Sequence, residues 1–130
     1  MAADHQICRL FSKDKQFQII WDINKLLQDL VNMSFNVEYK DVLRLSEQDG
    51  GICTDPEYAM ITDISKPCVI IKLDENVEIF IDGNHRLYKA RMLEAKNIPC
   101  FVLPAEYHKK FIIDYDANIY EKVIADYCTE

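Results

Sequence analysis

Hydrophobic residues near the N-terminus follow first a strand pattern and then a helix pattern. Residues 16–21 are predicted to form a short strand with Phe17, Ile19 and Trp21 on one face. The clearest helical spacing comes directly after it, in Ile23, Leu26, Leu27, Leu30 and Val31. Asp22 precedes this pattern and is expected to cap the helix. Residues 1–15 are mixed in polarity and are expected to begin as a frayed or partly ordered arm.

Two further helices are predicted in the middle of the chain. Residues 36–46 show helical spacing, with an inner face of Tyr39, Val42 and Leu43. Residues 47–54 contain two adjacent glycines and are expected to form an exposed loop. Asp55 followed by Pro56 has the form of an N-cap with proline at the first helical position, so a short helix is expected over residues 56–63.

The next segment predicts two strands of a sheet. Residues 67–73 form a continuous apolar run with β-branched residues, which is typical of an interior strand. A turn at residues 74–76 leads back into a second strand as a hairpin. Apolar and other residues alternate in this second strand, and its predicted core face is Val77, Ile79 and Ile81.

A helix, a strand and a last helix complete the predicted fold. Asn84 is expected to cap a helix over residues 85–97. Residues 99–103 form a further strand, in an order that fits a crossover from strand to helix to parallel strand. Asp116 is expected to cap the last helix, whose apolar positions are Ile119, Tyr120, Val123, Ile124 and Tyr127. Residues 1–130 are therefore predicted to form one α+β domain with a small mixed β-sheet and surrounding helices.

Charge narrows the classes of function. The 130 residues have a formal net charge of −7, which argues against a protein that coats duplex DNA. Residues 84–110 contain six basic and two acidic residues, whereas residues 111–130 contain one basic and five acidic residues. This segregation indicates either a local anion site on an acidic protein or ordinary surface charge. No membrane span or signal peptide is predicted, so a cytoplasmic protein without membrane contact is expected.

The cysteines and His108 are assigned structural roles at this point. Five cysteines, an odd number without paired spacing, fit reduced thiols better than disulfides. Cys68 and Cys100 fall in predicted strands and are expected to be core residues. Neither these two nor Cys53 has metal-ligand spacing, so no metal site is predicted. His108 precedes two lysines and is expected to face solvent.

The junction at Gly83, between the predicted strand and helix, is the candidate site. Glycine permits a positive φ and a close approach to the main chain, and the N–H groups of a helix start can bind an anion. His85 and Arg86 add donors suited to phosphate oxygens, although Arg86 could instead pair with Asp82. His85 could also relay a proton or pack as a structural residue. Asp82 could hold Mg²⁺, act as a base or hydrogen-bond its own backbone.

The chain resembles the ParB/sulfiredoxin superfamily in three segments: Pro67-Cys68-Val69-Ile70-Ile71, Ile81-Asp82-Gly83-Asn84-His85-Arg86-Leu87-Tyr88-Lys89-Ala90 and Ile98-Pro99-Cys100-Phe101-Val102. The resemblance covers residues 21–103 and centres on a Gly-x-x-Arg motif between a strand and a helix. It implies that ATP or another nucleotide, with or without Mg²⁺, binds through its phosphates to Gly83, Asn84, His85 and Arg86. The candidate catalytic residues are then Asp82 and His85.

Members of this superfamily differ in activity, and the motif narrows the choice. Asn84 stands where sulfiredoxin has a cysteine, which argues against sulfiredoxin activity. DNA-segregation proteins carry Glu-Arg-Arg after the glycine and a helix-turn-helix module after the domain; this sequence has Asn-His-Arg after the glycine, so a whole segregation protein is not expected. The motif from Asp82 to Arg86 is closest to the Asp-Gly-His-His-Arg form of free-serine kinases. No upstream glutamate can be matched to the catalytic glutamate of those kinases.

Two functions of different classes follow from the sequence. The first is a nucleotide- or phosphate-binding domain, and whether it also catalyses phosphoryl transfer or nucleotide hydrolysis stays open. The alternative is a small acidic immunity or antitoxin-type protein that binds and neutralises a basic toxin domain. A third hypothesis is nuclease activity on nucleic acid.

Overall fold

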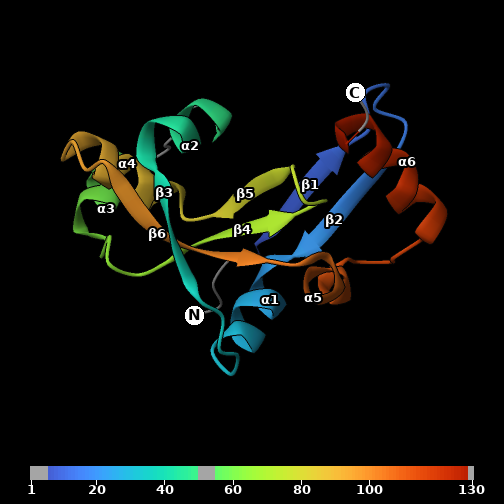
Figure 1. Cartoon of the computed structure of the whole chain (residues 1–130), viewed down its shortest axis with the longest axis horizontal. Helices are drawn as coiled ribbons and strands as arrows, with labels where there is room; N and C mark the ends of the chain where they lie inside the picture. The colour runs from blue at the N-terminus through green and yellow to red at the C-terminus, as the bar shows by residue number, and fades with distance from the viewer. Residues whose placement is uncertain (1–5, 50–54, 129–130) are drawn as a thin grey trace. The chain divides into compact units, whose positions relative to one another are not determined.

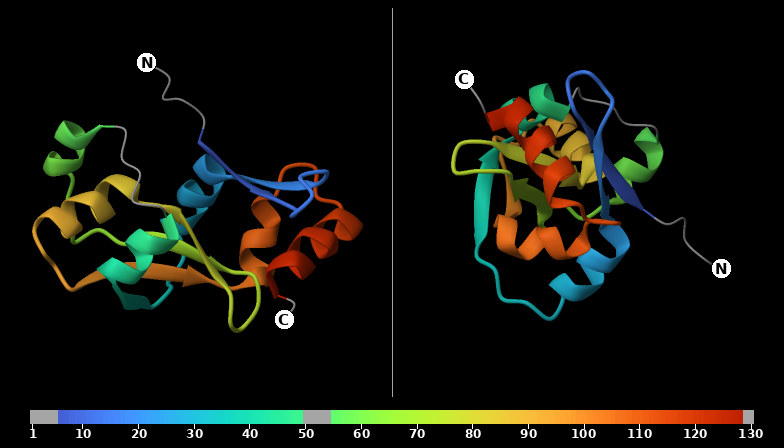
Figure 2. Two further views of the ribbon diagram at one scale, coloured as in Figure 1. Left: turned by 90° about the horizontal axis from the view of Figure 1, so that it is seen from above. Right: turned by 90° about the vertical axis from the view of Figure 1, so that its right-hand side faces the viewer.

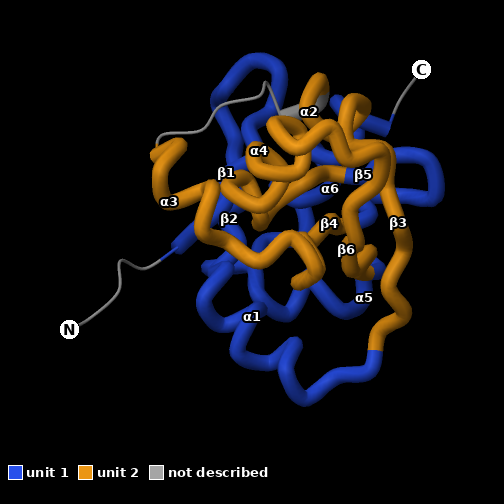
Figure 3. Tube along the Cα trace, turned by 90° about the vertical axis from the view of Figure 1, so that its left-hand side faces the viewer, with its two compact units in different colours: residues 1–34, 72–78, 104–130 blue, residues 35–71, 79–103 orange. Residues whose placement is uncertain are grey.

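The fold is mixed α+β, as predicted (Figure 1). A computed structural model describes residues 6–49 and 55–128, which form one two-stranded and one four-stranded sheet with six α-helices. Contacts divide the chain into two compact units, coloured separately in Figure 3. Unit 1 comprises residues 1–34, 72–78 and 104–130, and unit 2 comprises residues 35–71 and 79–103. The prediction of one domain over residues 1–130 stays a prediction.

The four-stranded sheet has the order β3-β6-β4-β5. Its strands are β3 (Val37–Asp41), β4 (Cys68–Lys72), β5 (Glu78–Asp82) and β6 (Asn97–Leu103). It lies in unit 2 except for residues 72 and 78, at the hairpin between β4 and β5. β6 runs parallel to β4 and antiparallel to β3. The three strands predicted in this part of the chain are confirmed. The predicted crossover led from β5 through a helix to a parallel strand, but β6 pairs with β4, and β5 lies at the edge of the sheet.

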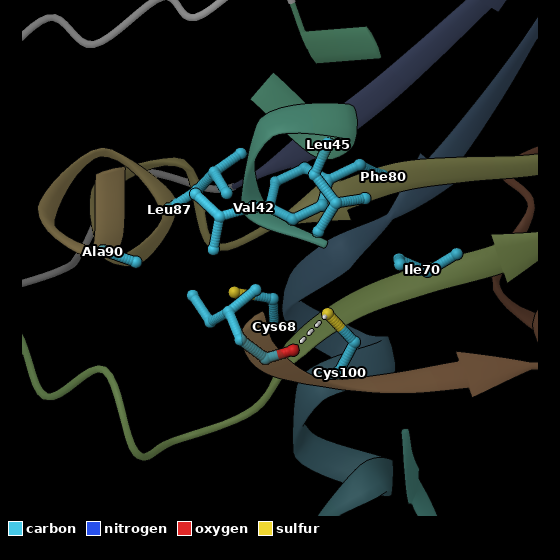
Figure 4. Packing of buried hydrophobic residues seen from close by; sticks show 9 residues of the cluster. Val42, Leu45, Cys68, Ile70, Phe80, Leu87, Ala90 and Cys100 are labelled. Carbon is cyan, nitrogen blue, oxygen red and sulfur yellow. Dashed lines mark hydrogen bonds between the residues drawn. The ribbon is translucent and has the colours of Figure 1, made fainter. Parts of the chain in front are cut away.

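The core of unit 2 lies where β4 meets helices α2 (Val42–Asp49) and α4 (Asn84–Met92). Four of the five residues of β4 are buried, as expected for an apolar interior strand. The buried cluster consists of Val42, Leu45, Cys68, Ile70, Phe80, Leu87, Ala90, Ile98 and Cys100 (Figure 4). The core positions of Cys68 and Cys100 are thus confirmed. On β5 the predicted inner face is wrong: Phe80 joins this cluster, whereas Ile79 and Ile81 are only partly buried.

The helix predicted over residues 36–46 is wrong in its first half. Val37–Asp41 is the edge strand β3, and the helix begins only at Val42. Main-chain pairing with β6 satisfies the backbone groups of β3, and this outweighs the local helical spacing. Tyr39 is 71% exposed and Leu43 is 65% exposed, so only Val42 of the predicted inner face is buried.

Helix α2 has a defined start and continues beyond its predicted end. The Asp41 carboxylate accepts a hydrogen bond of 3.0 Å from the backbone N–H of Arg44, which caps the helix. Helical residues continue to Asp49, so the loop predicted over residues 47–54 is helical at its beginning. Residues 50–54, including both adjacent glycines, lie outside the described residues.

The sequence predicted the start of helix α3 (Pro56–Ile61) correctly, but not the end of helix α4. Asp55 accepts a hydrogen bond of 3.0 Å from the backbone N–H of Tyr58, which confirms the predicted start of α3. Helix α4 ends at Met92, earlier than the predicted residue 97. Glu94 has a positive φ of 58°, and the N–H of Ala95 bonds to the carbonyl oxygen of Ala90 at 2.9 Å. A helix that ends in this left-handed conformation usually has glycine there. Because the residue is glutamate, the sequence did not predict the end of the helix.

Unit 1 begins with an antiparallel hairpin of β1 (Ile7–Phe11) and β2 (Gln18–Asp22), visible in Figure 2. The predicted frayed arm is wrong from Ile7 onward, because β1 pairs along its whole length with β2. Residues 1–5 lie outside the described residues. Helix α1 (Ile23–Leu30) follows as predicted, and Asp22 caps it by accepting a hydrogen bond from the N–H of Lys25 at 3.0 Å.

Two short helices and a longer one complete unit 1: α5 (Ala105–His108), the 3₁₀ helix η1 (Lys109–Phe111) and α6 (Ala117–Cys128). The Asp116 carboxylate accepts hydrogen bonds from the N–H groups at the start of α6, which confirms the predicted cap. Tyr120 and Val123 are the buried residues of this helix. Within the described part of the chain, no helix has both the length and the apolar character needed to cross a membrane.

His108 is buried in unit 1, contrary to the prediction that it faces solvent. The indole N–H of Trp21 donates to His108 Nδ1 at 3.1 Å, and His108 Nε2 lies 2.8 Å from the carbonyl oxygen of Lys72. These partners fit a neutral ring that carries its proton on Nε2 and donates it to Lys72. Lys109 and Lys110, which follow His108, place their ammonium groups over tyrosine rings. Their charge was therefore no sign that His108 faces solvent.

Candidate functional site

Gly83 joins β5 to α4 in a conformation that only glycine adopts easily. Its φ is +118° and its ψ is +22°. A Cβ atom added here would lie 2.5 Å from Sγ and 2.8 Å from Cβ of Cys68, on the neighbouring strand β4. Both the backbone and the packing therefore require glycine. The sequence predicted a close approach to the main chain, and the group that makes it is the Cys68 side chain.

The start of α4 corrects the predicted role of Asn84. Gly83 is the N-cap residue, and Asn84 is exposed and already the first residue of the helix. Gly83 has no side chain that could cap this first turn. The carbonyl oxygen of Gly83 accepts the first helical hydrogen bond from Leu87 N–H at 2.8 Å. The helix start thus relies on backbone geometry, and its N–H dipoles point toward the turn.

Arg86 and Asp82 form an ion pair across this turn. Arg86 Nη2 lies 3.2 Å from Asp82 Oδ2, and both side chains are largely buried, with 21% and 14% exposed. The pairing that the sequence left open is therefore present. Arg86 Nε is also buried, and it has no hydrogen-bond acceptor among the described residues. The guanidinium is held in place and still has a donor to satisfy.

His85 and Lys89 attach α3 to α4. The ring of His85 meets the ring of Tyr58 edge to face, with centroids 4.9 Å apart and an interplanar angle of 89°. Lys89 Nζ donates to the carbonyl oxygen of Thr62, at the end of α3, at 2.6 Å. Lys89 therefore links α4 to the end of α3. His85 is partly buried and lies beside Tyr58, which is exposed.

The thiol of Cys68 lies in a positive local field. Its side-chain interaction with Cys100 is the main factor that lowers the pKa of Cys68, and the charge of Arg86 and a hydrogen bond from the Arg86 side chain lower this pKa further. Burial and the Asp82 carboxylate act in the opposite direction. The pKa of Cys100 is raised by its side-chain interaction with Cys68 and by burial, and its thiol donates to the carbonyl oxygen of Ile98 at 3.6 Å. These surroundings favour negative charge on Cys68 more than on Cys100.

The structure adds residues to the predicted site. Asp82, Gly83, Asn84, His85 and Arg86 are consecutive and all lie at this turn. Cys68, Cys100 and Tyr58 come from β4, β6 and α3, and the sequence did not place them here. The strand register that aligns the two cysteines depends on non-local pairing, for which the sequence contains no direct signal.

A surface pocket of about 590 Å³ lies at the other end of α4. Its lining residues are Asp41, Leu43, Arg91, Met92, Glu94, Ala95, Lys96 and Asn97. None of the five predicted site residues lines this pocket. Across residues 6–49 and 55–128, no group of three or more histidine, cysteine or acidic side chains is placed to bind a metal ion.

Comparisons with known proteins do not assign the chain to a family. No protein-family model matches it, and neither a curated protein nor a solved structure shows significant similarity. The functional argument therefore rests on the residues and geometry of the Gly83 turn.

Proposed function

We propose that the Gly83 turn, at residues 82–86, binds the phosphate group of a nucleotide or a similar small anion, in a ParB/sulfiredoxin-like domain. The observation that carries the proposal is the Arg86 guanidinium. It is fixed beside the first turn of α4, with its buried Nε lacking an acceptor among the described residues. A phosphate oxygen would supply that acceptor and would also meet the positive end of the helix dipole.

Each residue of the turn has a role in this proposal. The backbone of Gly83 and Asn84 presents N–H groups, and Arg86 provides charge and a directional hydrogen bond. His85 is placed to donate a hydrogen bond or a proton, and the neighbouring Tyr58, which is 51% exposed, offers an aromatic surface to a nucleobase. Asp82 would repel a phosphate, and Mg²⁺ bound between the carboxylate and the phosphate would offset this repulsion.

The test is calorimetric titration of ATP, ADP, CTP and inorganic phosphate into the full chain, each with and without Mg²⁺. Arg86→Ala is expected to weaken binding at least about tenfold, since a charge-assisted hydrogen bond contributes about 1.5–3 kcal/mol. Arg91→Ala is the matched control, because Arg91 lies on the same helix but is exposed in its last turn. Equal losses in the two variants would indicate only a general effect of positive charge.

Asp82→Asn separates the role of the metal from that of the arginine. If phosphate binds Arg86 directly, removal of the carboxylate charge should strengthen binding in the absence of Mg²⁺. If Mg²⁺ bridges Asp82 and the phosphate, the same variant should lose the part of the affinity that depends on Mg²⁺. Any hydrolysis or phosphoryl transfer that occurs should then be reduced in His85→Ala without an equal loss of nucleotide affinity.

A second proposed function is the binding of a basic protein, such as a toxin domain, by an acidic immunity or antitoxin-type protein. Unit 1 contains thirteen acidic and eight basic residues, a net charge of −5, against −2 for unit 2. Three of its lysines, Lys109, Lys110 and Lys122, lie over aromatic rings of the same unit. If no nucleotide or phosphate binds, this becomes the better proposal, and the affinity for a basic partner should then fall steeply with added salt.

A further inference from the structure

Cys68 and Cys100 are directly paired residues of two adjacent strands. Cys68 begins β4, Cys100 lies in β6, and the parallel register places them side by side. Both side chains are fully buried and belong to the same core cluster (Figure 4). In-register neighbours point to the same face of a sheet, so the two side chains share a face, and Cys68 lies beneath the Gly83 turn.

The strand spacing permits a bond between the two sulfurs. Neighbouring strands lie about 4.8 Å apart, which falls within the range of about 4.4–6.8 Å between the Cα atoms of a disulfide. The Cβ atoms of a disulfide lie about 3.5–4.5 Å apart, a separation that paired residues of adjacent strands can approach.

The two thiols are not equivalent. The Cys68 thiol donates to the carbonyl oxygen of Gly83, the N-cap residue of α4, at 3.8 Å, and the Cys100 thiol donates to that of Ile98 at 3.6 Å. Arg86, in the first turn of α4, favours negative charge on Cys68 and has a buried donor without an acceptor among the described residues. This arrangement assigns Cys68 as the attacking sulfur and Cys100 as the thiol that resolves the product.

The other described cysteines lie in less favourable surroundings. Burial raises the pKa of Cys8 to about 11. Burial and the hydrogen-bonded Asp74 carboxylate raise the pKa of Cys128 to about 11. Both thiols are therefore protonated at neutral pH, and a protonated thiol is a poor nucleophile. The contrast predicts selective oxidation of Cys68 even though it is the more deeply buried.

We propose that Cys68 and Cys100 form a redox-active pair that hydrogen peroxide, or another small hydroperoxide, converts reversibly into a disulfide. The Cys68 thiolate attacks one peroxide oxygen, the O–O bond breaks, and hydroxide leaves and takes up a proton to become water. The sulfur of Cys100 then attacks the sulfenic acid of Cys68, the S–O bond breaks, and a second water leaves with the Cys100 proton. Two thiols and one peroxide thus give one disulfide and two waters.

Oxidation at this place would change the Gly83 turn. Sγ of Cys68 fills the space beside Gly83 that a Cβ would need. Drawing the sulfur toward Cys100 would empty this space and remove the thiolate that Arg86 faces. The pair itself does not depend on whether the turn binds phosphate.

The test is cysteine mapping of the full chain after exposure to hydrogen peroxide, with free thiols then alkylated under denaturing conditions. Cleavage on the N-terminal side of aspartate yields residues 63–73 and 82–113, which contain Cys68 and Cys100 respectively as their only cysteines. The expected product is these two peptides joined, with a mass two hydrogen atoms below their sum. Dithiothreitol should restore both free peptides.

Substitutions identify the role of each sulfur. In Cys100→Ser, dimedone should trap a sulfenic acid on Cys68, whereas in Cys68→Ser the residue Cys100 should remain free for alkylation. Cys128→Ser is the matched control and should keep the joined peptides. The proposal is overturned if, in the unmutated chain, both cysteines stay alkylatable while Cys8 or Cys128 is oxidised, or if Cys68 becomes linked to a different cysteine. Neither of these results depends on how well a variant folds.

Discussion

Gly83 meets two independent requirements at one position. Its φ of +118° is unfavourable for every residue with a Cβ, and the space that a Cβ would need is filled by Cys68. The same residue begins α4 and brings Asp82 and Arg86 together across the turn. The shape of the proposed site therefore depends on the contact between Gly83 and β4 as much as on the residues that would touch a ligand.

We predict that Gly83→Ala lowers the free energy of unfolding by about 2–5 kcal/mol. Backbone strain contributes about 1–2 kcal/mol and overpacking against Cys68 about 1–3 kcal/mol. Denaturant unfolding of the full chain measures the change. In a Cys68→Ala background the Sγ contact is absent, so the loss caused by Gly83→Ala should be smaller there. An equal loss in both backgrounds would mean that only the backbone conformation matters.

At the scale of elements, α4 is defined by its two ends. It begins at a left-handed glycine and ends in a left-handed turn at Glu94, where the N–H of Ala95 reaches the carbonyl oxygen of Ala90. The Gly83 end bears the proposed anion site, and residues near the Glu94 end line the pocket of about 590 Å³. Glutamate is an unusual residue for a left-handed helix end, which places strain at a surface turn.

Glu94→Gly should therefore stabilise the protein by about 0.5–1 kcal/mol, because glycine adopts the left-handed conformation without strain. Thermal or denaturant unfolding measures this gain. Gly83→Ala provides the opposite comparison at the other end of the same helix. Nucleotide binding at the Gly83 turn should stay unchanged in Glu94→Gly, and a lower stability of this variant would contradict the assigned strain.

At the scale of the whole molecule, the dependence of stability on pH should report on His108. Burial lowers its pKa below the usual value of about 6.5, although the hydrogen bond to Lys72 acts in the opposite direction. The unfolded chain then binds a proton at a higher pH than the folded chain does. Stability is accordingly complete above about pH 6.5 and decreases as the pH falls toward the lower folded pKa.

The expected decrease is at most about 1.4 kcal/mol for each pH unit in this window, since one proton is involved. Denaturant unfolding between pH 7.5 and pH 5 measures this decrease, because the range includes the usual histidine pKa of about 6.5. In His108→Gln the amide cannot titrate, so the slope due to this residue should disappear even if the variant is less stable throughout. An unchanged slope in this variant would assign the pH dependence to other groups.

Local signals in the sequence were enough for several elements. Asp22, Asp55 and Asp116 are side-chain caps whose bonding partners lie within three residues, and all three helix starts were predicted from them. The apolar run at β4 likewise predicted a buried strand. The motif of the candidate site is continuous in the chain, so its members could be named without any knowledge of the fold.

Other features were decided only by the tertiary structure, because they depend on residues that are far apart in the sequence. Val37–Asp41 became a strand because β6 lies beside it, and His108 became buried because Trp21 and Lys72 satisfy both of its ring nitrogens. The register of β4 against β6 placed Cys68 beside Cys100. A hydrophobic pattern determines which residues avoid water, whereas the identity of their neighbours follows from non-local pairing, which leaves no periodic mark in the sequence.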